Sequence, residues 1–248
     1  MRTRLCAITT LLLLAATVLT WKALRPVSSV AEATGQSVQG IIDTDTVWTL
    51  ANSPYRVIGD ITVLPGITLT IEPGVVVQFA APEEPWEVSG YGLIISGTLR
   101  ARGTELSPIA FTGYWWHITF TPSSTPWDGA AGTGCVLEHC VMDGDGQGHY
   151  PMPGRAAVNC EDASPLIIHC RLRWYTVSAL FVAGERAAPR ITHSDIFSGD
   201  SSTSLVAGGR AYIAHNTIGP GCAAIGGLSL IHISEPTRPL YISYAVFC

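Results

Sequence analysis

Lysine is almost absent from this 248-residue chain: the one lysine is Lys22. Residues 34–227 carry nine arginines against seventeen acidic residues, a net charge of −8. A protein that binds nucleic acid needs a basic surface to contact the phosphates, so this negative net charge excludes nucleic-acid binding. Amphipathic helical spacing is also missing from residues 34–227, whereas Gly, Pro and Thr are frequent. We therefore expect one folded, β-rich domain.

The chain also lacks an apolar run of full transmembrane length. Its longest run, residues 5–19, is shorter than the roughly 20 residues that cross a bilayer. Arg2 and Arg4 precede the run, and Ala31 and Ala33 follow after a short polar stretch, which is the order of a secretory signal. We interpret residues 1–33 as a signal peptide or a membrane anchor. Either predicts a secreted or cell-surface protein that touches a membrane only through an uncleaved N-terminal segment.

The C-terminal residues 228–248 resemble an artificial sequence rather than a protein segment. Residues 228–238 resemble the in-frame translation of a transposase-end adapter from sequencing libraries, and residues 242–248 resemble the flow-cell adapter that follows it. We therefore expect a non-native, adapter-derived tail, with the natural protein continuing past Gly227. His232 and Cys248 consequently enter no functional hypothesis.

Four segments repeat one order of chemical types: an apolar residue, a histidine two positions later, and a second apolar residue three positions after that. The apolar pairs are Leu137 and Met142, Ile167 and Leu172, Ile191 and Ile196, and Ile213 and Ile218. A period of about 20–30 residues is typical of a solenoid, in which each unit buries its apolar face against its neighbours. The sequence therefore predicts an all-β, single-domain solenoid, truncated at its C-terminal end.

Residues 55–79 show the strand pattern most clearly. Ile67, Leu69 and Ile71 alternate with threonines, and the Pro-Gly pairs at 65–66 and 73–74 are turn signals. We also predict a turn at Gly59 and Asp60, between strands at 55–58 and 61–64.

A resemblance to a known superfamily rests on three segments: residues 61–79, 97–105 and 107–112. Together they resemble the opening rungs of exported bacterial right-handed parallel β-helix proteins, a superfamily that includes pectate lyases, polygalacturonases and surface proteins without a known role. The resemblance spans nearly all of residues 45–227. It implies a right-handed parallel β-helix over residues 34–227, and it does not imply an activity.

The spacing within each repeat predicts a corner. An unbroken strand keeps two side chains on one face only at an even offset, and the two apolar residues of each repeat are five positions apart. Each corner holds a histidine: His139, His169, His193 and His215. Imidazoles ligate metals, but in a straight column spaced by about 4.8 Å at most two neighbours could share one ion. We therefore expect a structural ladder and no metal cofactor.

Five cysteines remain in residues 34–227, at spacings that match neither a disulfide framework nor a zinc site. They are Cys135, Cys140, Cys160, Cys170 and Cys222. Cys140 and Cys170 occupy equivalent positions of adjacent repeats, so their α-carbons should lie about 4.8 Å apart, within the range of a disulfide. Two alternatives stay open: a stack of buried thiols, or a bridge.

Charged residues next to the corner are the candidates for polysaccharide cleavage. Asp143 aligns with Arg173, and Arg171 aligns with Asp195, so opposite charges should be neighbours on adjacent rungs. Such pairs are usual on sheet faces, and a catalytic or sugar-contacting role is the alternative.

We expect no cofactor, and calcium is the alternative. Asp143 and Asp145 lie among glycines and are candidate calcium ligands, although the segment lacks the further acidic positions of an EF-hand loop. Glu161 and Asp162 are the other acidic pair nearby.

Aromatic residues are the candidates for contact with a sugar. They are Trp115, Trp116, Trp127, Trp174 and Tyr175. Such rings serve as flat platforms for sugars when exposed, and fill solenoid cores when buried. The inserts at 122–134 and 144–154 lengthen single rungs, and such loops usually carry function.

These observations predict an exported or cell-surface β-helix that acts as a binding or structural module, with a polysaccharide or another cell-surface component as its partner. The alternative is a polysaccharide lyase or glycoside hydrolase of the β-helix type.

Overall fold

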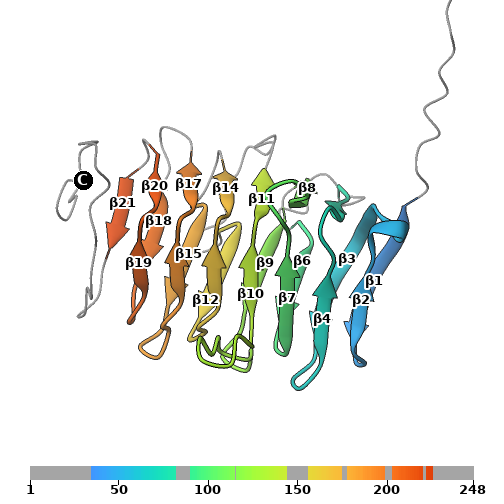
Figure 1. Cartoon of the computed structure of the whole chain (residues 1–248), viewed down its shortest axis with the longest axis horizontal. Coiled ribbons are helices and arrows are strands. Elements are labelled where there is room, and N and C mark those ends of the chain that lie inside the picture. The colour runs from blue at the N-terminus through green and yellow to red at the C-terminus, as the bar shows by residue number, and fades with distance from the viewer. Residues whose placement is uncertain are drawn as a thin grey trace, which may run out of the picture. The chain divides into compact units, whose positions relative to one another are not determined.

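The protein is described by a computed structural model that covers residues 35–81, 90–114, 116–143, 156–174, 178–198, 203–219 and 222–225; for residues 203–207 and 222–225 it describes the backbone. All strand ladders in this part of the chain are parallel. The strands stack in file from β1 (Gln36–Ile42) to β21 (Cys222–Ile225) (Figure 1). The predicted all-β parallel solenoid is therefore confirmed.

Successive coils contribute strands to three faces. Face 1 consists of the first half of β3 (Tyr55–Val63), β5 (Val76–Phe79), β8 (Ile109–Gly113), β11 (Cys140–Asp143), β14 (Arg171–Trp174), β17 (Asp195–Ser198) and β20 (Thr217–Ile218). Face 2 consists of the second half of β3, β6 (Gly92–Ile95), β9 (His117–Phe120), β12 (Val158–Glu161), β15 (Leu180–Ala183), β18 (Thr203–Ala207) and β21. Face 3 consists of β2 (Thr46–Trp48), β4 (Thr68–Ile71), β7 (Thr98–Arg102), β10 (Val136–Glu138), β13 (Leu166–Ile168), β16 (Arg190–Thr192) and β19 (Tyr212–Ala214).

The predicted turn at Gly59 and Asp60 is a bend inside one strand instead. Residues 55–57 of β3 pair with β5, and residues 61–63 pair with β6, so the strand passes from face 1 to face 2 without ending. The Asp60 Oδ1 atom accepts a hydrogen bond of 2.7 Å from the Gly92 N–H. The polar residue at the bend thus links two coils rather than ending a strand.

The repeated apolar residues form two columns inside the coil. Leu137, Ile167, Ile191 and Ile213 are direct partners on successive strands of face 3. Met142, Leu172, Ile196 and Ile218 are partners on face 1. Seven of these eight side chains are at most 7% exposed, and Ile218 packs against the same core. The predicted alignment of the repeats is therefore confirmed.

The predicted corner between the two columns is confirmed by the backbone. His139, His169, His193 and His215 have φ angles of 47°, 54°, 51° and 56°, in the left-handed region. Histidine belongs to the residue types that are enriched in this region. One left-handed residue turns the chain sharply from face 3 into face 1. Because of this turn, both apolar residues of a repeat point inward although they are five positions apart.

The residue after each histidine points into the corner and satisfies backbone groups that the turn leaves unpaired. The Cys170 N–H donates to the Ser194 Oγ atom (3.0 Å), and the Ser194 N–H donates to the Asn216 Oδ1 atom (2.9 Å). Ser194 Oγ in turn donates to the Thr192 carbonyl (3.0 Å), and Asn216 Nδ2 to the Ile191 carbonyl (2.8 Å). The short polar side chains of Ser194 and Asn216 therefore suit this position, as the sequence indicated.

Replacement of Ser194 with alanine tests this polar ladder. The change leaves the Cys170 N–H and the Thr192 carbonyl without their side-chain partner at a position that is 2% exposed, so we expect a loss of about 1–3 kcal/mol in the free energy of unfolding. Urea denaturation followed by circular dichroism measures it. Alanine at the exposed Ser123 is the control, with an expected change within about 0.5 kcal/mol. Equal effects of the two variants would contradict the assignment.

Of the two alternatives for the cysteines, the structure shows the buried thiols. Cys135, Cys140, Cys160 and Cys170 are free and at most 3% exposed. The Cys140 Sγ atom lies 3.5 Å from the Glu138 carbonyl, and the Cys170 Sγ atom lies 3.3 Å from the Ile168 carbonyl. These thiols thus occupy the same place in the polar ladder as the Ser194 hydroxyl. The side chain of Cys222 lies outside the described residues.

The described residues contain one short 3-10 helix, η1 (Leu50–Asn52), and no helix that could reach across a bilayer.

Candidate ligand-binding surface

The insert at residues 122–134 folds back over face 3. The Trp127 N–H donates to the Ser164 carbonyl of the next coil (2.8 Å), and the Cys135 N–H donates to the Thr125 carbonyl at the base of the loop (3.0 Å). The Asp128 Oδ1 atom accepts from the Ala130 and Ala131 N–H groups at 2.9 and 3.2 Å, which holds the tip of the loop. Val136, beside the loop, is fully buried although its position in β10 faces outward. The loop is therefore anchored to the solenoid.

This anchoring holds Trp127 against Arg102 of face 3, which is paired with Glu138 on the neighbouring strand. The Arg102 Cζ atom lies 5.2 Å from the centroid of the Trp127 ring. Arg102 Nη1 donates to Glu138 Oε2 (3.0 Å), and Nη2 donates to the Gly132 carbonyl (3.3 Å). The side chains of Arg102 and Glu138 are 46% and 28% exposed, and Trp127 is half-buried. We call Arg102, Trp127 and Glu138 the Trp127 platform.

A second stacked pair lies at the far end of face 3. The Arg190 Cζ atom lies 5.0 Å from the centroid of the Tyr212 ring. Half-buried Leu166 and Ile168 lie on β13, between the two pairs. From β7 to β19 the face extends over four strand spacings, or about 19 Å. Its outer surface therefore combines guanidinium groups, aromatic rings and aliphatic side chains in two neighbouring columns, one through Arg102, Glu138 and Ile168 and one through Leu166, Arg190 and Tyr212.

The other aromatic candidates are distributed differently. Trp116 and Trp174 are 2% and 7% exposed, and their rings meet edge to face at 5.1 Å. Trp116 also stacks on Phe79, with ring centroids 5.1 Å apart. Of the two roles proposed for aromatic residues, core packing therefore describes Trp116 and Trp174, and Trp127 alone among the described candidates reaches the surface. Trp115 and Tyr175 lie outside the described residues.

The candidate catalytic residues gather on face 1. Asp143 is the direct partner of Arg173, and Arg171 is the direct partner of Asp195, as the alignment predicted. All four are exposed. The ion pairs of 4.0 Å or less in the described chain are Arg102–Glu138 and Arg186–Asp162, so these four neighbours do not form close pairs.

The two aspartates of face 1 have α-carbons that are farther apart than the carboxyl groups of glycosidases. Asp143 and Asp195 are separated by two strand spacings and two residues along the strand, or about 12 Å between α-carbons. Retaining and inverting glycosidases place their carboxyl groups about 5–5.5 Å and about 6.5–9.5 Å apart. This α-carbon spacing does not favour a hydrolytic carboxylate pair on face 1.

Asp162 has a structural role at another corner. Its φ angle is 47°, and its Oδ1 and Oδ2 atoms accept hydrogen bonds from the Arg186 N–H (3.0 Å) and guanidinium (3.3 Å). The bond from the Arg186 backbone N–H, with its guanidinium, lowers the pKa of Asp162. Its neighbour Glu161 is exposed. Of the calcium candidates, Asp143 is exposed and Asp145 lies outside the described residues.

Sequence reasoning missed Arg102, Glu138, Arg190 and Tyr212. Arg102 and Glu138 were detectable in part. Each directly follows an inward-facing residue of face 3, Ala101 or Leu137, so each should point outward. The stacking of Arg102 on Trp127 had no signal in the sequence, since it depends on the path of the insert.

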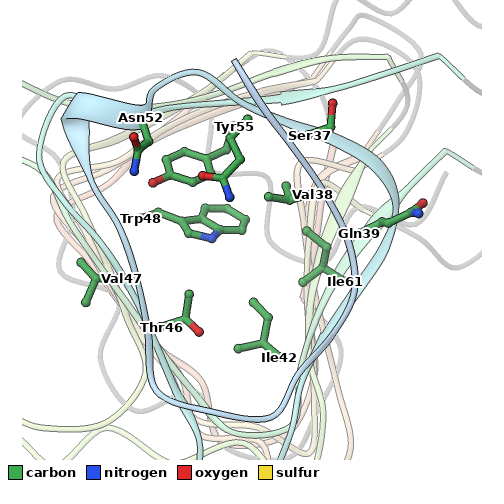
Figure 2. Close-up of a pocket in the computed structure, with 11 residues that line it drawn as sticks. Ser37, Val38, Gln39, Ile42, Thr46, Val47, Trp48, Asn52, Tyr55 and Ile61 are labelled. Carbon is green, nitrogen blue, oxygen red and sulfur yellow. The ribbon is translucent and has the colours of Figure 1, made fainter. Parts of the chain in front are cut away.

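A separate pocket of about 540 Å³ lies at the N-terminal end of the coil. Val38, Ile42 and Ile61 line it together with Trp48 and Tyr55, whose rings stack at 4.8 Å (Figure 2). The Tyr55 hydroxyl accepts a hydrogen bond from the Thr49 N–H (2.8 Å). None of the residues that line the pocket is charged.

Comparison with known proteins adds one local similarity. No protein-family profile and no solved structure matches the chain. The chain is similar to Protein bark beetle of Drosophila melanogaster, with 41% identity over 70 residues. The match covers 28% of this chain and 2% of the length of that protein. It therefore supports no statement about the function of the whole chain.

Proposed function

We propose that this protein is an exported or cell-surface binding module that holds a carbohydrate polymer along face 3. The observation that carries the proposal is the Trp127 platform, where an aromatic ring stays at the surface while Trp116 and Trp174 are buried. A ring face stacks on the apolar face of a sugar, and the guanidinium and carboxylate groups beside it hydrogen-bond to hydroxyl groups.

The length of face 3 supports a polymer rather than a single sugar. The Arg190–Tyr212 pair repeats the combination of cation and ring, and Arg190 lies three strand spacings, or about 14 Å, from Arg102 of the Trp127 platform. The resemblance of residues 61–79, 97–105 and 107–112 to exported bacterial right-handed β-helix proteins supports membership in that superfamily and secretion. The leader-like residues 1–33 support the same location.

An enzyme is the second candidate function, and one observation favours it. Asp143, Arg171, Arg173 and Asp195 lie together on three adjacent strands of face 1. A base beside a cation is the combination that a polysaccharide lyase needs to take a proton and stabilise the resulting charge. The wide separation of the Asp143 and Asp195 α-carbons makes a lyase the better fit of the two enzyme classes.

Replacement of Trp127 with alanine tests the binding proposal. We expect affinity for the recognised polysaccharide to fall at least about tenfold, or about 1.4 kcal/mol, because the stacking surface is lost. Affinity electrophoresis against a panel of neutral and acidic polysaccharides measures it. Alanine at Leu106, which is 95% exposed on the loop between β7 and β8, is the matched control and should leave binding unchanged.

Mixing the protein with the same panel of polysaccharides separates the binding module from the enzyme. Equal affinities of the Trp127 and Leu106 variants for every polysaccharide, or no binding by the unmodified protein, would remove the support for the binding module. Depolymerisation that is abolished by Asp143→Asn or Arg173→Gln would establish the enzyme instead.

A further inference from the structure

The histidine column forms a continuous stack on the outside of the solenoid. Ring centroids are 4.8 Å apart between His139 and His169, 5.2 Å between His169 and His193, and 5.0 Å between His193 and His215. His169, His193 and His215 are exposed, and His139 is half-buried. The left-handed backbone at each position directs the side chains outward at the same corner. The ladder is thus a surface feature and not part of the core.

The ring nitrogens of His139, His169 and His193 make no hydrogen bond or ion pair within the described part of the protein. Within the described residues, the contacts of the His139, His169 and His193 side chains are the ring contacts between neighbours, and no hydrogen bond or ion pair engages their nitrogens. The corner itself requires only a residue that tolerates positive φ, for which glycine or asparagine is sufficient. The backbone therefore does not explain why all four corners carry an imidazole.

From this geometry we propose that adjacent histidines of the ladder bind a transition-metal ion in pairs. Two nitrogens that share an ion at about 2.1 Å lie at most about 4.2 Å apart, which is slightly less than the distance between ring centroids. The His169 and His193 planes are inclined by 38°, the largest tilt in the ladder, so one pair of ring edges already converges. Exposed side chains complete the approach by a small rotation.

The chemistry of the donors selects the ion. Imidazole nitrogen suits Zn²⁺, Cu²⁺ and Ni²⁺, whereas Ca²⁺ requires several oxygen ligands. No group of three or more His, Cys, Asp or Glu side chains in the described chain is arranged to hold a metal, so each ion keeps water at its remaining positions. Four histidines in file form two separate pairs, which limits the ladder to two ions. By the Irving–Williams order, Cu²⁺ should bind more tightly than Zn²⁺.

The test measures binding of Cu²⁺, Zn²⁺ and Ca²⁺ to the untagged protein by isothermal titration calorimetry. We expect Cu²⁺ to bind more tightly than Zn²⁺, and Ca²⁺ to show no binding at the ladder. The double variant His169→Asn, His193→Asn removes both inner rings and keeps a residue that tolerates positive φ. His139 and His215 then lie three coils apart, so Zn²⁺ affinity should fall at least tenfold. His117→Asn, which removes an imidazole from face 2, is the control and should leave the Zn²⁺ and Cu²⁺ affinities unchanged.

Electron paramagnetic resonance of the Cu²⁺ complex gives a readout that does not depend on the folding of a variant. Coupling to two equatorial nitrogens is the expected signature of a shared pair. A single nitrogen, unchanged Zn²⁺ affinity in the double variant, or no Zn²⁺ or Cu²⁺ binding by the unmodified protein would each overturn the proposal. Carbohydrate binding is measured separately, so the outcome is independent of the proposed function.

Discussion

Replacing Trp116 with alanine should lower the free energy of unfolding by about 3–5 kcal/mol, the range for removing a large buried aromatic side chain. Trp116 is 2% exposed and contacts Phe79, Phe111 and Trp174, with ring centroids 5.1, 5.9 and 5.1 Å away. Those rings belong to β5, β8 and β14, so one side chain ties several coils together. Urea denaturation followed by far-ultraviolet circular dichroism measures the change.

Phenylalanine at position 116 is the matched control. The buried Trp116 indole N–H has no hydrogen-bond acceptor among the described residues, so its removal relieves an unsatisfied donor while a ring stays in the core. We expect Trp116→Phe to change the free energy of unfolding by less than about 1.5 kcal/mol. If the free energy of unfolding fell no more in the alanine variant than in the phenylalanine variant, the aromatic cluster would not stabilise the fold as described.

Raising the pH from 8 to 10 should destabilise the protein by about 4 kcal/mol through three buried thiols. Burial raises the pKa of Cys135 from 9.0 to about 11. Burial also raises the pKa of Cys160 and of Cys140, and in Cys140 the hydrogen bond with Cys170 adds to the effect. The folded protein therefore keeps these protons at a pH where the unfolded chain has lost them.

The direction of the effect follows from proton binding. Above about pH 9 the unfolded state binds fewer protons than the native state, so the free energy of unfolding falls as the pH rises. Each thiol contributes about 1.4 kcal/mol per pH unit until its own folded-state pKa is reached. Below this window the thiols are neutral in both states, and their contribution to stability is complete.

Urea denaturation at a series of pH values, with a reductant present, measures this dependence. The double variant Cys135→Ala, Cys160→Ala should retain about one third of the alkaline loss, since one of the three raised thiols remains. Its lower stability at neutral pH, caused by the missing side-chain volume, does not change with pH. An identical pH dependence in both proteins would show that other groups cause the loss.

The arrangement of the coils was predictable from the sequence because it depends on the periodicity of apolar residues. Leu137, Ile167, Ile191 and Ile213 recur at equivalent positions, and burying them requires that the coils lie in register. The odd spacing within each repeat required the corner, and the left-handed histidines provide it. The same register brought Asp143 beside Arg173 and Arg171 beside Asp195.

Prediction was less complete for side chains at inserts and strand ends. Trp116 follows the end of β8 and Trp127 belongs to the insert, so neither has a repeat partner that fixes its direction. One lies in the core and the other at the surface. At Gly59 and Asp60 turn-forming residues occur inside a continuous strand, because pairing with β5 and then β6 continues through the bend.

The sequence by itself determined the parallel solenoid, the inward columns and the position of the corner, because these depend on the recurrence of residue types along the chain. The tertiary structure decided which aromatic rings reach the surface, that the thiols remain free, and that Arg102 stacks on Trp127 and pairs with Glu138. The two contacts of Arg102 join residues 25 and 36 positions apart through the path of a loop and the stacking of coils. No local pattern encodes such a path, since it results from the packing of the loop against the finished coils.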